Sequence, residues 1–140
     1  MALIHGFTQT SRCWGPLHDA LKSDHEVVPI DAPGHGAASD VSADLDQAAE
    51  LAFEAGGAST YLGYSMGGRI ALHTALAHPH DVERLVLFHH DPYHSDAELE
   101  VLLEEAHAKW RGMEDRVCLA FDGMTLDIDA EGVRIDQPSS

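Results

Sequence analysis

The chain has 140 residues, of which 44% are hydrophobic, so it is long enough for one domain around a single core and too short for two. Its formal net charge of −16 would repel nucleic acid and anionic lipid, which excludes both as expected partners. No apolar stretch approaches the ~20 residues that span a bilayer, and the first residues, MALIHG, lack the pattern of a signal peptide. Because Cys13 and Cys118 form no spacing motif, we expect a cytoplasmic protein with free thiols.

Short apolar runs bounded by glycine, proline or polar residues predict buried strands at residues 2–5, 26–31, 59–64 and 84–89. Helical periodicity follows three of these runs, at about 15–22, 43–55 and 66–78. The alternation of strand and helix is typical of an α/β fold. It predicts a mainly parallel sheet with right-handed crossovers and helices on both faces.

The C-terminal third continues this alternation. Ser95 and Glu98 form a capping box, which predicts a helix whose apolar face carries Leu99, Leu102, Leu103, Ala106 and Trp110. A further strand is predicted at about 115–121, which gives a sheet of four or five strands in a single domain, residues 1–140. After Gly123 the pattern weakens, and the segment either forms a hairpin around residues 131–132 or frays.

The motif GYSMG places Ser65 between a predicted strand and a predicted helix. A serine on a very tight strand-to-helix turn needs small residues two positions before and two after it, because larger side chains there would collide. Gly63 and Gly67 meet this requirement. Such a turn raises the Ser65 hydroxyl above the sheet and directs the amide of Met66 toward a developing oxyanion. The motif therefore predicts a nucleophile, and a glycine-rich turn without chemistry is the alternative.

Two loops that follow strands complete this picture. The residues His5-Gly6-Phe7 come directly after the first strand, where the amide of Phe7 would supply a second oxyanion donor. In the D-A-P-G-H-G loop, Asp31 is expected to accept amide hydrogen bonds that fix the turn. We interpret Asp31 as structural and His35 as a loop or pocket-lining residue in preference to a catalytic base.

Three segments resemble the α/β-hydrolase superfamily: HGFTQTSRCW (5–14), DAPGHGAAS (31–39) and GYSMGGRIALHTALAHP (63–79). The resemblance covers about residues 2–88. Within the superfamily the segments are most similar to the menaquinone-pathway lyase 2-succinyl-6-hydroxy-2,4-cyclohexadiene-1-carboxylate synthase and its esterase-like relatives.

This resemblance implies an enzyme that acts on a small ester or carboxylate without a cofactor. Ser65 would be the nucleophile or base, and the amides of Phe7 and Met66 would form the oxyanion hole. The turn would be built on Gly63, Gly67 and Gly68. Arg69 would bind a substrate carboxylate through its guanidinium fork, and an ordinary surface arginine is the alternative.

The family pattern continues with an acid and then a histidine after later strands. We expect this sequence to end before them, and to begin at the third strand of the family's sheet. The expected result is a truncated enzyme, either active through substitute partners or inactive. Strand edges left without neighbours would favour pairing between copies, and the oligomeric state stays open.

From about residue 84 the sequence changes character. Residues ~84–140, with the stretches LVLFHHDPYHSDAELEVLLEEAHAKW (85–110) and DRVCLAFDGMTLDI (115–128), resemble the C-terminal end of a metallo-β-lactamase-fold hydrolase. In that family the residue that matches His89 binds a metal. The chain then has the pattern of a chimera, with a hydrolase core over 1–88 and a foreign tail over 89–140.

The H-H-D-P-Y-H segment leaves three interpretations open. His89, His90 or His94 would take the proton of Ser65, with Asp91 or Asp96 orienting the ring. Alternatively, His89, His90, Asp91 and His94 would offer nitrogen and oxygen ligands to zinc. The third interpretation is a polar loop that leads into the helix capped by Ser95.

Overall fold

A computed structural model describes residues 1–82, 85–87, 93, 95–109, 116–120, 123–129 and 132–136. The chain divides into two compact units, Met1–Val82 and Glu83–Ser140. The division lies close to residue 84, from which the sequence pattern changes character. The single domain expected from the length stays a prediction.

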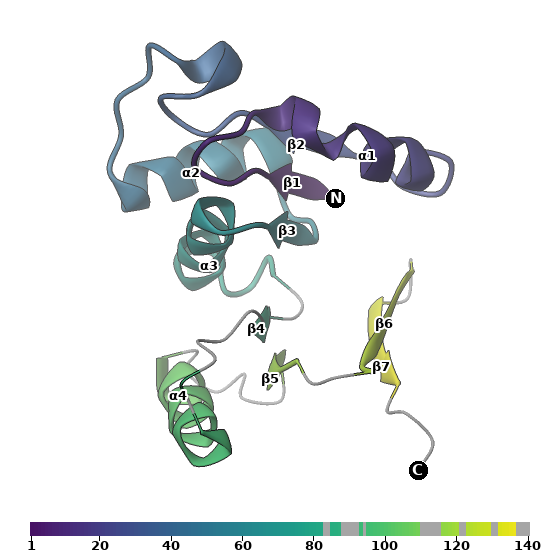
Figure 1. Ribbon diagram of the computed structural model, residues 1–140, viewed down its shortest axis with the longest axis vertical. Coiled ribbons are helices and arrows are strands. Elements are labelled where there is room, and N and C mark those ends of the chain that lie inside the picture. The colour runs from purple at the N-terminus through teal and green to yellow at the C-terminus, as the bar shows by residue number, and fades with distance from the viewer. Residues whose placement is uncertain are drawn as a thin grey trace. The chain divides into compact units, whose positions relative to one another are not determined.

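The first unit contains a three-stranded parallel sheet with the order β2-β1-β3 (Figure 1). The strands are β1 (Ala2–Ile4), β2 (Val28–Ile30) and β3 (Tyr61–Gly63). Their last residues are paired, since Ile4 lies beside Ile30 on one side and Gly63 on the other. All three strands predicted for this region are therefore present. The loops that follow them leave the sheet at one edge, where sites in such sheets form.

Three α-helices of the first unit follow the predicted ranges closely: α1 (Gly15–Leu21), α2 (Leu45–Gly56) and α3 (Met66–Ala77). Two short 3-10 helices, η1 (Ser11–Trp14) and η2 (Gly36–Ala38), lie in addition to the predicted elements. Local sequence sets the ends of α2. Asp44 accepts a hydrogen bond from the Gln47 N–H (2.9 Å), and the Gln47 side chain accepts one from the Asp44 N–H (3.1 Å). Gly57, with φ 61°, ends the helix in a conformation that favours glycine.

The core of the first unit lies between the sheet and the helices α2 and α3. Its buried cluster consists of Ile4, Ala32, Ala48, Ala52 and Ile70. The small residues of α2 let it approach α3 and the sheet closely. Thr74 of α3 is also buried, and its hydroxyl donates to the carbonyls of Ala49 (3.3 Å) and Ile70 (3.0 Å). A polar side chain is thus accommodated at the helix pair because its hydrogen bonds are satisfied.

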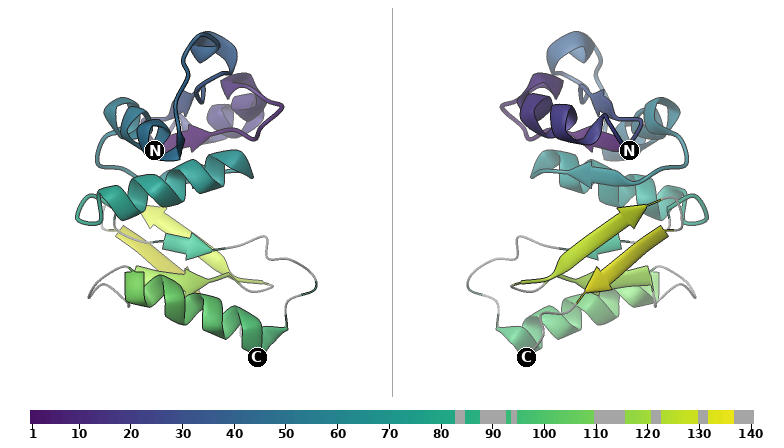
Figure 2. Two further views of the ribbon diagram at one scale, coloured as in Figure 1. Left: turned by 90° about the vertical axis from the view of Figure 1, so that its left-hand side faces the viewer. Right: turned by 90° about the vertical axis from the view of Figure 1, so that its right-hand side faces the viewer.

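Both faces of this sheet are covered. Successive side chains of a strand point to opposite faces, so Leu3 faces away from the cluster that contains Ile4. Leu3 is nevertheless fully buried, and η1 contacts both β1 and β2. The two views of Figure 2 show α1 on one side of β1 and α2 on the other. This confirms the predicted α/β arrangement for the first unit.

The second unit contains a parallel pair of strands, a helix and a hairpin: β4 (Leu85–Leu87), α4 (Asp96–Lys109), β5 (Val117–Leu119), β6 (Thr125–Asp129) and β7 (Gly132–Asp136). The predicted capping box is present at the start of α4. The Ser95 N–H donates to the Glu98 carboxylate (2.7 Å), and the Glu98 N–H donates to the Ser95 hydroxyl (3.4 Å).

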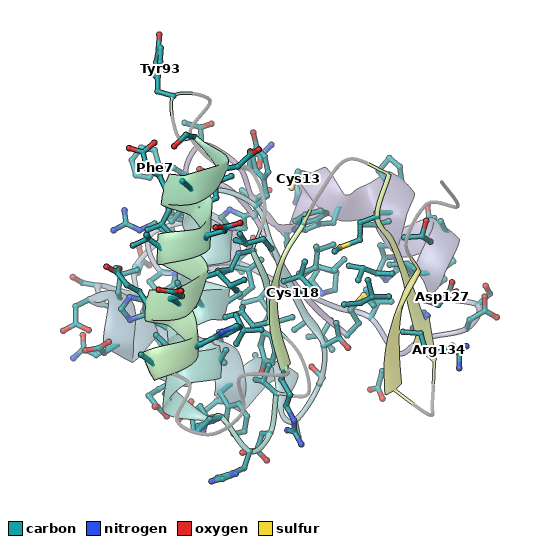
Figure 3. All side chains as sticks on the ribbon, turned by 90° about the horizontal axis from the view of Figure 1, so that it is seen from below. Phe7, Cys13, Tyr93, Cys118, Asp127 and Arg134 are labelled. Atoms are coloured by element: carbon teal, nitrogen blue, oxygen red, sulfur yellow. The ribbon has the colours of Figure 1, made fainter. Side chains whose placement is uncertain are left out.

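Of the two outcomes left open for the C-terminal segment, the hairpin is the one found. Strands β6 and β7 are antiparallel, and Asp127 lies directly opposite Arg134 (Figure 3). Opposite charges at facing positions stabilise such a pair modestly. None of the helices in the described ranges combines the length and the apolarity that crossing a bilayer requires.

Candidate active site

Ser65 occupies an unusual turn between β3 and α3. Its backbone angles are φ 55° and ψ −114°, and within the described ranges it is the one residue other than glycine with a positive φ. Residues with a Cβ atom rarely adopt backbone angles with a positive φ, so the conformation of Ser65 is strained. The Ser65 side chain is exposed and makes no capping hydrogen bond to α3. The turn therefore presents the Ser65 hydroxyl to solvent at the start of α3.

The glycines around Ser65 are required by close backbone contacts. A Cβ atom on Gly63 would lie 2.2 Å from the carbonyl oxygen of Gly67. One on Gly67 would lie 2.1 Å from the carbonyl oxygen of Ile4. At Gly68 the nearest atom would be the carbonyl oxygen of Gly63, at 3.2 Å, so this position is less restricted. The collision expected from the motif at positions two before and two after the serine is thus present in the structure.

The loop that follows β1 lies against the serine turn. The Tyr64 N–H donates to the carbonyl of Ile4 (3.1 Å), and a Cβ on Gly6 would lie 2.9 Å from the Tyr64 ring. The loop with Phe7 and the turn with Ser65 are therefore neighbours at the same edge of the sheet. Met66 is the first residue of α3, where amide groups have no partner earlier in the helix. The structure brings together the segments that carry Phe7, Ser65 and Met66.

His5 has a structural role that the sequence did not reveal. Its side chain is completely buried; Nε2 accepts a hydrogen bond from the Ala32 N–H (3.1 Å), and Nδ1 donates to the carbonyl of Gly6 (2.8 Å). The ring therefore joins the end of β1 to the end of β2. A histidine placed directly after a wholly apolar strand was the one available signal, because a polar side chain there needs internal partners.

Asp31 fixes the loop after β2, as the sequence predicted. Its carboxylate accepts hydrogen bonds from the amides of Ser11 (2.6 Å) and Ala37 (2.9 Å). These bonds, first that from Ser11 and then that from Ala37, hold the pKa of the Asp31 carboxyl below its usual value, although burial acts in the opposite direction. Asp31 thus connects η1 to η2, and each of its two carboxylate oxygens accepts one of these hydrogen bonds.

We expect Asp31→Asn to cost about 1–3 kcal/mol of folding free energy at neutral pH, because an amide oxygen replaces a charged acceptor and one amide loses its partner. The folded pKa of Asp31 lies below the unfolded one, so its stabilisation is complete above the unfolded pKa of ~3.9 and is lost as pH falls through the folded pKa. Urea denaturation should therefore show a smaller difference between wild type and variant at pH ~3 than at neutral pH.

The exposed Asp40 supplies the control for this measurement. Asp40→Asn should leave the free energy of unfolding nearly unchanged. A cost for Asp31→Asn that is the same at both pH values would contradict the assigned role of the Asp31 charge.

Of the remaining predicted site residues, the structure describes Arg69 but not the histidines and the aspartate of the H-H-D-P-Y-H segment. Arg69 is exposed in α3, one helical turn after Ser65, and its N–H donates to the Ser65 carbonyl (3.2 Å). The tail residues His89, His90, Asp91 and His94 lie outside the described residues, so the proton-transfer and zinc interpretations stay predictions. Within the described ranges, no group of three or more His, Cys, Asp or Glu side chains is arranged to hold a metal ion.

An apolar cavity of about 170 Å³ lies between the loop after β2, α2 and Ile70 of α3. Ser65 does not line it. Asp31 is its one charged lining residue, and the Asp31 carboxylate is already held by two amides. The cavity is therefore a gap in the core region, separate from the serine turn.

Comparison with known proteins relates the chain to enzymes. Residues 1–126 match the family described as the alpha/beta hydrolase family. The pimeloyl-[acyl-carrier protein] methyl ester esterase of Vibrio atlanticus is 34% identical over 123 residues, which cover 86% of this chain and 45% of the relative. The esterase of the same name from Nitrosomonas europaea is 32% identical over 123 residues, with coverages of 86% and 45%. The chain thus spans about half the length of these curated relatives.

Solved structures give the same result. A hydrolase from Pseudomonas aeruginosa PA01 superposes with a TM-score of 0.53 at 29% identity, over 76% of this chain and 42% of that one. NosK from Streptomyces actuosus gives a TM-score of 0.54 at 25% identity, over 82% and 61% of the two chains. The family match extends past residue 88 to residue 126. The expected resemblance of the tail to a metallo-β-lactamase-fold hydrolase is not tested by these similarities and stays a prediction.

Proposed function

The chain belongs to the α/β-hydrolase family, and from that premise we propose that it is a serine hydrolase that cleaves a small carboxylic ester. The observation that carries the proposal is the positive φ of Ser65 in the turn between β3 and α3. Strain of this kind persists where the surrounding structure enforces it, and it is concentrated at sites of function. A glycine would occupy the same turn without strain, so the presence of serine there favours a chemical role.

In the proposed reaction, the Ser65 Oγ attacks the carbonyl carbon of the ester. A bond forms between Oγ and this carbon, and negative charge develops on the carbonyl oxygen. The amides of Phe7 and Met66 would donate to that oxygen, aided by the positive end of the α3 dipole. The carbon–oxygen bond to the alcohol then breaks, and the alcohol leaves with a proton. Water attacks the acyl-serine, releases the acid and restores the Ser65 hydroxyl.

A base must accept the proton of Ser65, and two histidines near the sheet edge are poorly suited to this task. Both ring nitrogens of His5 are hydrogen-bonded inside the core. Both ring nitrogens of His35 face backbone carbonyls. The proposal keeps the base predicted from the sequence, one of His89, His90 and His94, with Asp91 or Asp96 orienting the ring.

The proposed substrate is an ester of a small acyl group that also carries a carboxylate. The curated relatives are named as methyl ester esterases, which favours ester hydrolysis over the lyase chemistry expected for a menaquinone-pathway enzyme. Arg69 is exposed one turn from Ser65, where its guanidinium would bind the carboxylate. No cofactor takes part in this reaction.

Hydrolysis of p-nitrophenyl acetate and butyrate, followed by the release of p-nitrophenol, tests the proposal. We expect the wild-type chain to hydrolyse these esters and Ser65→Ala to lose about 1,000-fold or more in kcat/KM. Ser39→Ala removes an exposed serine in the loop before α2 and should retain full activity. Equal rates for wild type and Ser65→Ala would refute the proposal.

A further inference from the structure

His35 connects the two loops at the carboxyl edge of the first sheet. Its Nδ1 faces the carbonyl oxygen of Pro33 (2.9 Å), and its Nε2 faces the carbonyl oxygen of Phe7, 28 residues away in sequence. A carbonyl oxygen only accepts hydrogen bonds and a neutral imidazole has a single N–H, so the tautomer with its proton on Nε2 donates to the Phe7 carbonyl. The ring therefore acts as a donor between the loop after β2 and the loop after β1.

The ring of His35 also packs against Phe7. The ring centroids of these two residues are 5.7 Å apart with an interplanar angle of 72°, an edge-to-face arrangement. The ring centroid of His35 also lies 5.2 Å from that of the buried His5. His35 is thus placed against a fixed part of the core and contacts both the backbone and the side chain of Phe7.

Phe7 has few other restraints within the described residues. Phe7 is 70% exposed, so burial contributes little to its position. The neighbouring Gly6 is held locally by Gln9, whose side chain accepts from the Gly6 N–H (3.1 Å) and whose own N–H donates to the Gly6 carbonyl (3.1 Å). These bonds close the loop on itself but do not connect Phe7 to the rest of the unit.

We infer that His35 is a positioning residue that holds the Phe7 backbone beside Ser65. The inference rests on the proposed function, in which the Phe7 amide donates to the oxyanion. His35 does not touch the reacting atoms and acts through Phe7. A shift of ~1 Å in such a donor can cost ~100-fold in rate, because the hydrogen bond forms in the transition state. His35 therefore determines rate and not substrate affinity.

Two substitutions separate the hydrogen bond from the ring contact. His35→Phe keeps an aromatic ring against Phe7 and removes the N–H donor, whereas His35→Gln keeps an N–H donor group. With the full chain and p-nitrophenyl butyrate, we expect His35→Phe to lower kcat about tenfold or more and to change KM less than about twofold. His35→Gln should recover part of kcat. An unchanged kcat in His35→Phe overturns the inference.

Amide hydrogen exchange of the full chain provides a readout that needs no activity. In His35→Phe, exchange at residues 6–8 should accelerate about tenfold relative to other loops, because the Phe7 carbonyl loses its partner. The control His80→Phe changes an exposed histidine and should leave residues 6–8 unaffected. Accelerated exchange in a chain that hydrolyses no ester would refute the proposed function and support the anchoring of Phe7. Unchanged exchange would refute the anchoring whatever the activity.

Discussion

The variant Gly67→Ala is expected to lose about 3 kcal/mol or more of folding free energy, or to remain unfolded. The added Cβ would lie 2.1 Å from the carbonyl oxygen of Ile4 and 2.6 Å from that of His5. Both atoms belong to the backbone at the end of the central strand, so relief of the clash would displace β1 or α3 and disturb the core around Ile4. Urea denaturation followed by circular dichroism measures the loss.

Gly15→Ala is the matched control, because it adds the same methyl group where nothing lies within 4 Å. Gly15 is the first residue of α1 and has helical backbone angles, φ −43° and ψ −55°. Alanine should therefore leave the free energy of unfolding unchanged or raise it by up to about 1 kcal/mol. A Gly67→Ala variant as stable as Gly15→Ala would contradict the close approach of α3 to the end of β1.

Ser65→Gly is expected to make the chain more stable while abolishing ester hydrolysis. Strained backbone of the kind seen at Ser65 costs about 1–3 kcal/mol, which glycine would relieve. The greater freedom of glycine in the unfolded chain offsets about 0.5–1 kcal/mol of this gain. The expected net gain is about 1 kcal/mol. Ester hydrolysis should fall to background because no hydroxyl remains.

Ser65→Ala separates the two effects, since alanine loses the hydroxyl but keeps a Cβ in the strained turn. Its free energy of unfolding should stay within about 0.5 kcal/mol of the wild-type value. Activity and urea denaturation are compared for the three chains. A Ser65→Gly variant less stable than Ser65→Ala would contradict the strain assigned to this turn.

The elements of the first unit could be predicted because each is encoded locally. Buried parallel strands consist of nearly continuous apolar runs, so β1, β2 and β3 could be recognised from short apolar runs and the residues that bound them. The serine turn was predictable for the same reason, since its steric requirement falls on residues two positions away in the same motif. The hairpin of β6 and β7 was left open because its period-2 pattern is short and weak.

The contacts between loops were not predictable from the sequence. The His5 ring is hydrogen-bonded to the Ala32 N–H, 27 residues away in sequence. The His35 ring is hydrogen-bonded to the Phe7 carbonyl, 28 residues away. These contacts follow from the strand order β2-β1-β3, which places the loops after β1 and β2 side by side. No periodicity in the chain encodes that order. Sequence reasoning could therefore name His35 as a loop residue but could not identify the carbonyl that it faces.

The central claim is that the Ser65 hydroxyl is a reactive nucleophile, and covalent labelling tests it most directly. The folded chain is treated with a fluorophosphonate, digested and mapped by mass spectrometry. The account predicts a single adduct on the peptide that contains Ser65, absent from Ser65→Ala. A folded wild-type chain without an adduct at Ser65, or an adduct of equal yield in Ser65→Ala, would contradict it.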